Sequence, residues 1–193
     1  MKISLHALNA ARRNLTNFWI GTAARYHRVY GIGYREVEGL AQEFSLDAMV
    51  ALRTACMAAA EPFPVLEGFS DKTIFTNKEG NWAFRFMHDM EHIAQKKGFG
   101  YQEERDVAHM HVRDVRDVFG LNSIESALTV ADTFGSLLYF AEYKDHPKDQ
   151  LGYALQYLDC YLDEFPRQDI HMMSPAAKDT TYFYDCADFI RAQ

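Results

Sequence analysis

The chain has 193 residues, of which 48% are hydrophobic and 24% are charged. This length and composition are typical of a globular protein with a sizeable core, and they exclude a disordered or fibrous chain. The formal net charge of −7 argues against nucleic acid as a partner, because such binding needs a dense basic surface.

Hydrophobic residues near the start of the chain recur mostly at helical spacing. Residues 5–29 place leucines and aromatic residues three and four positions apart, which predicts one or two amphipathic helices. We expect a short helix near residues 34–44 and a longer helix that begins after Ser45, whose side chain can cap it. Residues 61–80 contain two prolines and two glycines, and they predict an ordered loop or a short hairpin.

The rest of the chain predicts five more helices. Gly98-Phe99-Gly100 separates the first two, and its glycines permit a left-handed helix stop, so these helices should form an antiparallel pair. Because we find no repeat or linker, we expect one all-α domain over residues 1–193, a multi-helix bundle in which this pair carries the functional site. The five helices are predicted over residues 81–97, 102–119, 123–144, 149–165 and 179–191.

The sequence predicts a cytoplasmic protein. Its three cysteines, Cys56, Cys160 and Cys186, are odd in number and far apart, which is typical of reduced thiols. The N-terminus lacks the apolar core of a signal peptide, and no window is apolar enough for a transmembrane segment. Peripheral membrane contact and a homo-oligomer are both compatible with this sequence.

The most informative stretch surrounds two histidines on the predicted helix over residues 81–97. His88 and His92 are four residues apart, so they project from one helix face and can share a metal ion. Asp89 adjoins them on the flank of that face. Glu104, in the first turn of the returning helix, should face the end of the preceding helix and close the site. We therefore predict a metal site formed by His88, Asp89, His92 and Glu104.

Imidazoles combined with carboxylates suit several divalent metals. The mixture favours zinc, with iron, manganese and magnesium as alternatives. His111 lies two turns after Glu104 on the same helix face, where it can support a metal ligand or touch a bound molecule. The candidate catalytic residues near the metal are His111, Arg85 and Glu91.

The pattern His88-Asp89-x-x-His92, eleven residues, Glu104 resembles the zinc motif of the coenzyme Q biosynthesis protein 4 family. All four motif positions are present, and the resemblance covers residues 88–104. It implies an all-helical fold, a bound zinc ion and a role in processing the ring of a polyprenylated hydroxybenzoate. Family members act there in C1 decarboxylation and hydroxylation, and they help to organise a biosynthetic complex. The resemblance thus implies a metal-dependent lyase or hydroxylase-like enzyme, with a small aromatic or prenylated aromatic ligand.

Two other functions remain open from the residues. An HD-type phosphohydrolase acting on nucleotides would use His27, the His88-Asp89 pair and Asp132 to hold a metal that activates water. A non-catalytic binding or scaffold protein would instead use a structural metal to clamp the helix pair.

A protease pattern overlaps the same histidines. His88-x-x-Glu91-His92 matches the inverted zinc-protease motif, with Glu91 as general base and a distant carboxylate such as Glu164 as third ligand. The α/β context of that motif is missing from the predicted helices, so the four-ligand site is the preferred hypothesis.

Overall fold

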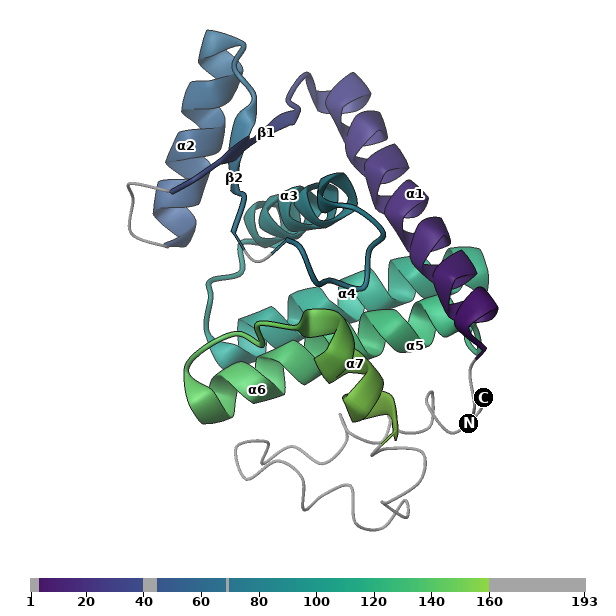
Figure 1. The fold of residues 1–193 in the computed structure, drawn as a ribbon. Coiled ribbons are helices and arrows are strands. Elements are labelled where there is room, and N and C mark those ends of the chain that lie inside the picture. The colour runs from purple at the N-terminus through teal and green to yellow at the C-terminus, as the bar shows by residue number, and fades with distance from the viewer. Residues whose placement is uncertain (1–3, 40–44, 69, 160–193) are drawn as a thin grey trace. The chain divides into compact units, whose positions relative to one another are not determined.

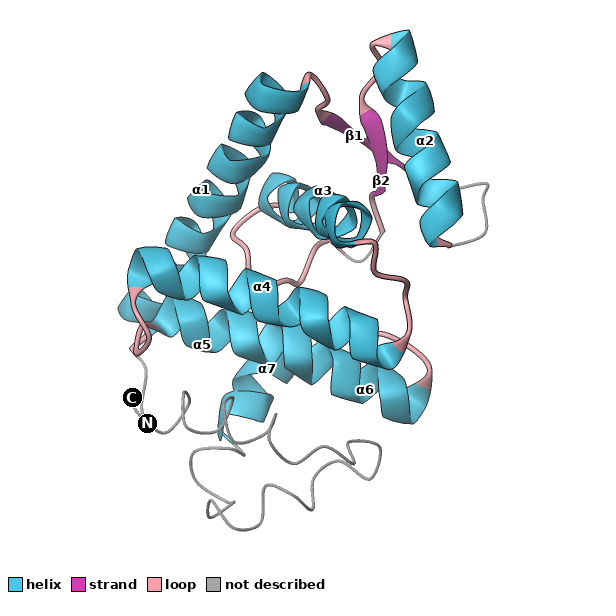
Figure 2. Cartoon of the chain, turned by 180° about the vertical axis from the view of Figure 1, so that it is seen from behind, coloured by secondary structure: helices cyan, strands magenta, loops and turns pink. Residues whose placement is uncertain are grey.

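A computed structural model describes residues 4–39, 45–68 and 70–159 of the chain. These residues are mainly helical, which confirms the predicted all-α class. Figure 1 follows the elements along the chain, and Figure 2 shows their types from the opposite side. In chain order the elements are α1 (Leu5–Tyr30), β1 (Tyr34–Val37), α2 (Leu46–Ala59), β2 (Phe63–Leu66), α3 (Lys78–Gln95), α4 (Tyr101–Phe119), α5 (Ile124–Val130), η1 (Ala131–Gly135), α6 (Ser136–Tyr143) and α7 (Gln150–Asp159).

Packing divides the chain into two compact units. One unit contains residues 12–107, and the other combines residues 1–11 with residues 108–193. Helices α1 and α4 each continue from one unit into the other. The single domain expected over residues 1–193 stays a prediction. Among the described residues, no helix is both long and apolar enough to cross a lipid bilayer.

The only sheet in the described part of the chain is a parallel pair of strands. Strand β1 lies beside β2, with Tyr34 opposite Phe63 and Val37 opposite Leu66. Helix α2 joins the two strands, because parallel neighbours need a crossover connection and not a tight turn. The predicted helix is therefore wrong at residues 34–37. Of the two alternatives for residues 61–80, the hairpin is wrong, whereas residues 70–77 form a loop. Local periodicity missed both strands because each pairs with a partner 29 residues away.

Helix α3 is anchored by an aromatic core in the unit formed by residues 12–107. Phe86 is fully buried, and its ring centroid lies 5.6 Å from that of Tyr26 and 5.3 Å from that of Tyr34. Phe63 of β2 adds a third ring at 6.2 Å. These contacts come from α1 and both strands, so they fix the position of the helix that carries His88 and His92.

A single arginine fastens the loop before α3 to α1. Arg12 donates hydrogen bonds to three successive carbonyl groups, those of Thr73, Ile74 and Phe75, at 3.2, 3.2 and 2.7 Å. A planar guanidinium group can reach several acceptors at once because its donors are arranged as a fork. The loop consequently has a defined course into the first turn of α3.

Both ends of α3 are capped, but not entirely as predicted. Asn77 caps the N-terminus by accepting a hydrogen bond from a backbone N–H three residues later. At the other end the left-handed residue is Lys96, with φ of 54°, so the predicted glycine stop is wrong. The glycines that follow have a different role. A Cβ atom on Gly100 would clash with the Glu103 carboxylate, which accepts a hydrogen bond from the Gly100 N–H.

The second compact unit contains α5, η1, α6 and α7. The helix predicted over residues 123–144 is interrupted by the π-helix η1, which reflects a change of hydrogen-bond spacing within one helical run. Gly135 lies against Tyr153 and Tyr157, where a Cβ atom would come within 3.3 Å of each ring. Beyond α7, the rest of the predicted helix over residues 149–165 and the helix over residues 179–191 lie outside the described residues.

Candidate metal centre

Three of the four predicted metal ligands meet in the structure. His88 and His92 lie one turn apart on α3, and Glu104 lies in the first turn of α4. One ligand atom from each side chain lies within 4.8 Å of the other two. All three residues belong to the unit formed by residues 12–107.

The three ligand atoms form a nearly equilateral triangle. The Nε2 atoms of His88 and His92 are 3.0 Å apart, and Oε2 of Glu104 lies 3.3 Å from His88 Nε2 and 3.5 Å from His92 Nε2. A tetrahedral metal with bonds of about 2.0–2.1 Å separates its ligand atoms by about 3.3 Å. The triangle therefore matches one face of a tetrahedral coordination site.

A backbone hydrogen bond orients the buried histidine. Nδ1 of His92 lies 3.1 Å from the carbonyl oxygen of Lys97, and this oxygen can only accept a hydrogen bond. The neutral ring thus carries its proton on Nδ1, which leaves the lone pair of Nε2 facing Glu104 and His88. Metal-bound histidines are commonly held in this way by a carbonyl group on the far ring nitrogen.

The charges of the cluster favour a cation between its members. Burial opposes ionisation of Glu104, but hydrogen bonds and charge from His88 and His92, when their Nε2 atoms carry protons, outweigh it and hold the pKa of Glu104 well below its usual range. Burial lowers the pKa of His92, but the hydrogen bond to Glu104 and the negative charge of Glu104 raise it, and the net shift is upward. An ionised carboxylate beside two imidazoles can be balanced by a proton or by a metal ion.

Asp89 is a close neighbour of this cluster but not one of its three members. Burial of its carboxylate raises the pKa to about 6, while the charges of His88, His92 and Arg85 act in the opposite direction. A metal ion bound by the triangle would favour the ionised form of Asp89, because an opposite charge nearby stabilises a desolvated carboxylate.

One side of the triangle is more open than the other. The His92 side chain is fully buried, whereas His88 keeps 26% and Glu104 keeps 24% of its side-chain surface exposed. The Phe99 ring packs on His92 at a centroid distance of 4.7 Å, and Phe84 lies 6.1 Å from His88. A metal at this position would have aromatic neighbours and at least one partly accessible side.

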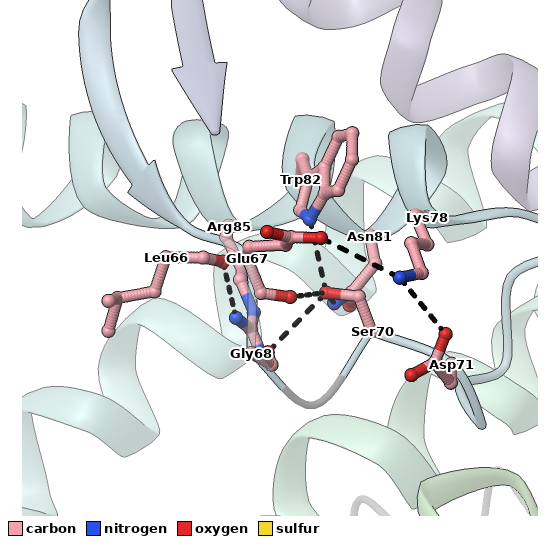
Figure 3. Close-up of polar contacts among 9 residues, drawn as sticks. All are labelled: Leu66, Glu67, Gly68, Ser70, Asp71, Lys78, Asn81, Trp82 and Arg85. Atoms are coloured by element: carbon pink, nitrogen blue, oxygen red, sulfur yellow. Dashed lines mark hydrogen bonds and ion pairs between the residues drawn. The ribbon is translucent and has the colours of Figure 1, made fainter. Parts of the chain in front are cut away.

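A buried serine ties the preceding loop to α3 (Figure 3). Ser70 accepts hydrogen bonds from Asn81 Nδ2 at 2.9 Å and Trp82 Nε1 at 3.1 Å, and it donates to the carbonyl oxygen of Glu67 at 2.7 Å. The Glu67 carboxylate also lies 3.7 Å from Lys78 Nζ. These bonds hold the N-terminal half of the helix that carries the two histidines.

The remaining sequence candidates take different positions. Arg85 donates to the carbonyl oxygen of Leu66 at 2.8 Å and also acts electrostatically on Asp89. Glu91 accepts a hydrogen bond from Gln95, at 3.0 Å, and is not part of the cluster. His111 is buried in the second compact unit, so its role beside the metal stays a prediction.

The alternative hypotheses draw on residues that do not belong to the three-residue cluster. His27 is exposed on α1 and lies outside the cluster, and Asp132 is buried in the second compact unit. Glu164 lies outside the described residues. Sequence reasoning overlooked Lys97 and Phe99, because no local pattern relates them to His92. No protein-family model, curated protein or solved structure matches this chain.

Proposed function

We propose that this chain is a metal-binding protein whose centre is formed by His88, His92 and Glu104. The observation that carries the proposal is the triangle of ligand atoms, with edges of 3.0, 3.3 and 3.5 Å. The Lys97 carbonyl group adds support, because its hydrogen bond with Nδ1 leaves Nε2 of the neutral His92 ring unprotonated.

Zinc is the metal that this donor set favours. Two imidazoles and one carboxylate are typical of catalytic zinc sites that keep a fourth position for water or substrate. The same set is typical of Fe(II) sites, which makes iron the first alternative. Asp89 is the neighbouring carboxylate that can complete the set, as the resemblance to the coenzyme Q biosynthesis protein 4 family implies.

We further propose a metal-dependent lyase or hydroxylase-like activity on a small aromatic or prenylated aromatic substrate. Its supports are that resemblance, the partly exposed edge at His88 and Glu104, and the rings of Phe84 and Phe99 beside the histidines. When bound, the metal would supply Lewis acidity towards an oxygen-bearing ligand. The chain itself would contribute the aromatic surroundings and the fixed orientation of His92.

A structural metal in a non-catalytic protein is the second candidate. The observation that favours it is the position of Asp89, whose carboxylate is close enough to respond to the charges of all three cluster members. If Asp89 coordinates the metal as well, four protein ligands close the site, as in structural zinc centres.

Elemental analysis of the purified protein tests the proposal. We expect about one metal ion per chain in the wild type and a loss of metal in His92→Ala and Glu104→Ala. His27→Ala and Glu91→Ala serve as matched controls and should retain the metal, because neither residue belongs to the cluster. Metal loss in His27→Ala with retention in Glu104→Ala would instead favour the HD-type phosphohydrolase. Absence of metal from the wild type, after loading with zinc and with iron, would refute the centre.

A further inference from the structure

Lys97 contacts both helices of the candidate metal centre through three separate groups. Its backbone N–H donates to the carbonyl oxygen of His92 at 2.9 Å, and its own carbonyl oxygen lies 3.1 Å from Nδ1 of the same histidine. Its ammonium group reaches α4, where Nζ lies 2.6 Å from Oδ2 of Asp106. One residue thus connects the end of α3 to the beginning of α4.

The carboxylate that receives this ammonium group is itself oriented. Gln102 donates to Oδ1 of Asp106 at 3.2 Å, one turn earlier on α4. The hydrogen bond from Lys97 is the main reason that the pKa of Asp106 lies below its usual range. The side chains of Lys97 and Asp106 keep 34% and 30% of their surface exposed, and the pair is therefore accessible to salt.

Asp106 does not reach the metal ligands directly. It lies two residues after Glu104, and positions two apart on a helix point to different faces. Apart from the effect of its charge, an ion pair at Asp106 can therefore influence Glu104 through the placement of α4 relative to α3. A change of about 1 Å in that placement would disturb a triangle whose edges are all between 3.0 and 3.5 Å.

We propose that Lys97 is a positioning residue of the metal centre, whose ion pair with Asp106 holds Glu104 at bonding distance from a metal shared with His88 and His92. This inference rests on the proposed metal-binding function. It gives the segment between the two helices a role in metal affinity in addition to that of the ligands.

The sign of the effect of Lys97→Met distinguishes positioning from simple electrostatics. Removing a positive charge near a cation site should strengthen metal binding if charge alone matters. If Lys97 positions α4, its removal should weaken zinc binding, roughly three- to tenfold for a partly exposed pair that supports a ligand. Lys96→Met is the matched control, because it removes the same charge one residue earlier, where no ion pair is present among the described residues.

The readouts are zinc affinity, from competition with a chromophoric chelator, and the visible spectrum of the cobalt-loaded protein. We expect Lys97→Met to lower zinc affinity and to alter the cobalt spectrum. The control Lys96→Met should not lower zinc affinity and should leave the cobalt spectrum unchanged. The difference between wild type and Lys97→Met should shrink in 1 M salt, where the ion pair is screened. Unfolding curves of the metal-free proteins show whether the variants keep their fold.

A charge exchange provides the second variant. Lys97→Glu and Asp106→Lys should each weaken zinc binding, and the double variant should recover part of the affinity, because it restores an ion pair between the same positions. Unchanged or tighter binding by Lys97→Met, together with no recovery in the double variant, would overturn the inference while the wild type still binds zinc. A wild type that binds no zinc would refute the metal centre itself and this inference with it.

Discussion

The Nε2 atoms of His88 and His92 lie 3.0 Å apart, with Oε2 of Glu104 within 3.5 Å of both. Two imidazole nitrogens at this distance need a proton or a metal ion between their lone pairs. In the neutral His92 ring the proton lies on Nδ1, which donates a hydrogen bond to the Lys97 carbonyl oxygen. The metal ion that we propose would satisfy the two Nε2 lone pairs and the Glu104 carboxylate together.

Metal binding should consequently stabilise the fold. Zinc at about one hundred times its dissociation constant should add about 2.7 kcal/mol to the free energy of unfolding, because the ligand set exists only in the folded chain. Differential scanning fluorimetry with and without zinc, and after treatment with a chelator, measures this shift. The variant His92→Ala is the reference, and its melting temperature should not respond to zinc. An equal response of both proteins would mean that zinc acts elsewhere.

Zinc affinity should fall as the pH falls from 8 to 5. Glu104 stays ionised in this range because its pKa is lowered, so protons compete mainly at the imidazoles. Interaction with Glu104 raises the pKa of His92, and competition should therefore begin at a higher pH than for an isolated imidazole. We expect about a tenfold loss per pH unit for each proton displaced. Titrations at several pH values test this, and an affinity independent of pH would argue against histidine ligands.

Ser70→Ala should destabilise the protein by about 1–3 kcal/mol, because it leaves the buried donors of Asn81 and Trp82 without their acceptor. Urea unfolding monitored by tryptophan fluorescence gives the change directly, since Trp82 is itself a partner. Thr54→Ala is a suitable control, because its exposed hydroxyl bonds only within its own helix and should cost less than about 1 kcal/mol. Equal effects of the two substitutions would show that the Ser70 network does not hold α3.

Arg12→Lys should also destabilise the fold, by about 1–3 kcal/mol, despite the retained charge. A lysine lacks the planar fork that reaches the carbonyl groups of Thr73, Ile74 and Phe75. Arg13→Lys is the control next to it in the sequence, on an exposed position of α1. The same urea experiment compares them, and similar stability of both variants would contradict the proposed anchoring of the loop.

Helical periodicity and spacing predicted the parts of the protein that depend on neighbouring residues. The long helices α1 to α4 and the cap at Ser45 follow from local sequence. The convergence of His88, His92 and Glu104 could also be predicted, because one helical turn and one short loop relate them.

Features that depend on distant partners could not be predicted in the same way. The strand pairing of Tyr34 with Phe63 joins segments that are far apart in sequence. The hydrogen bonds from Arg12 to the loop before α3 do the same. In both cases tertiary contacts override a local preference. The left-handed end of α3 falls at Lys96 although glycines follow it, and Gly98 and Gly100 instead lie against the Glu103 carboxylate.

The most direct test of the central claim is an anomalous difference map from a crystal of the zinc-loaded protein, with data collected at energies above and below the zinc absorption edge. We predict one peak in the unit formed by residues 12–107, about 2.0–2.2 Å from His88 Nε2, His92 Nε2 and an oxygen of Glu104. A fully loaded crystal with no peak among these three atoms, or with its zinc bound at other residues, would contradict the account.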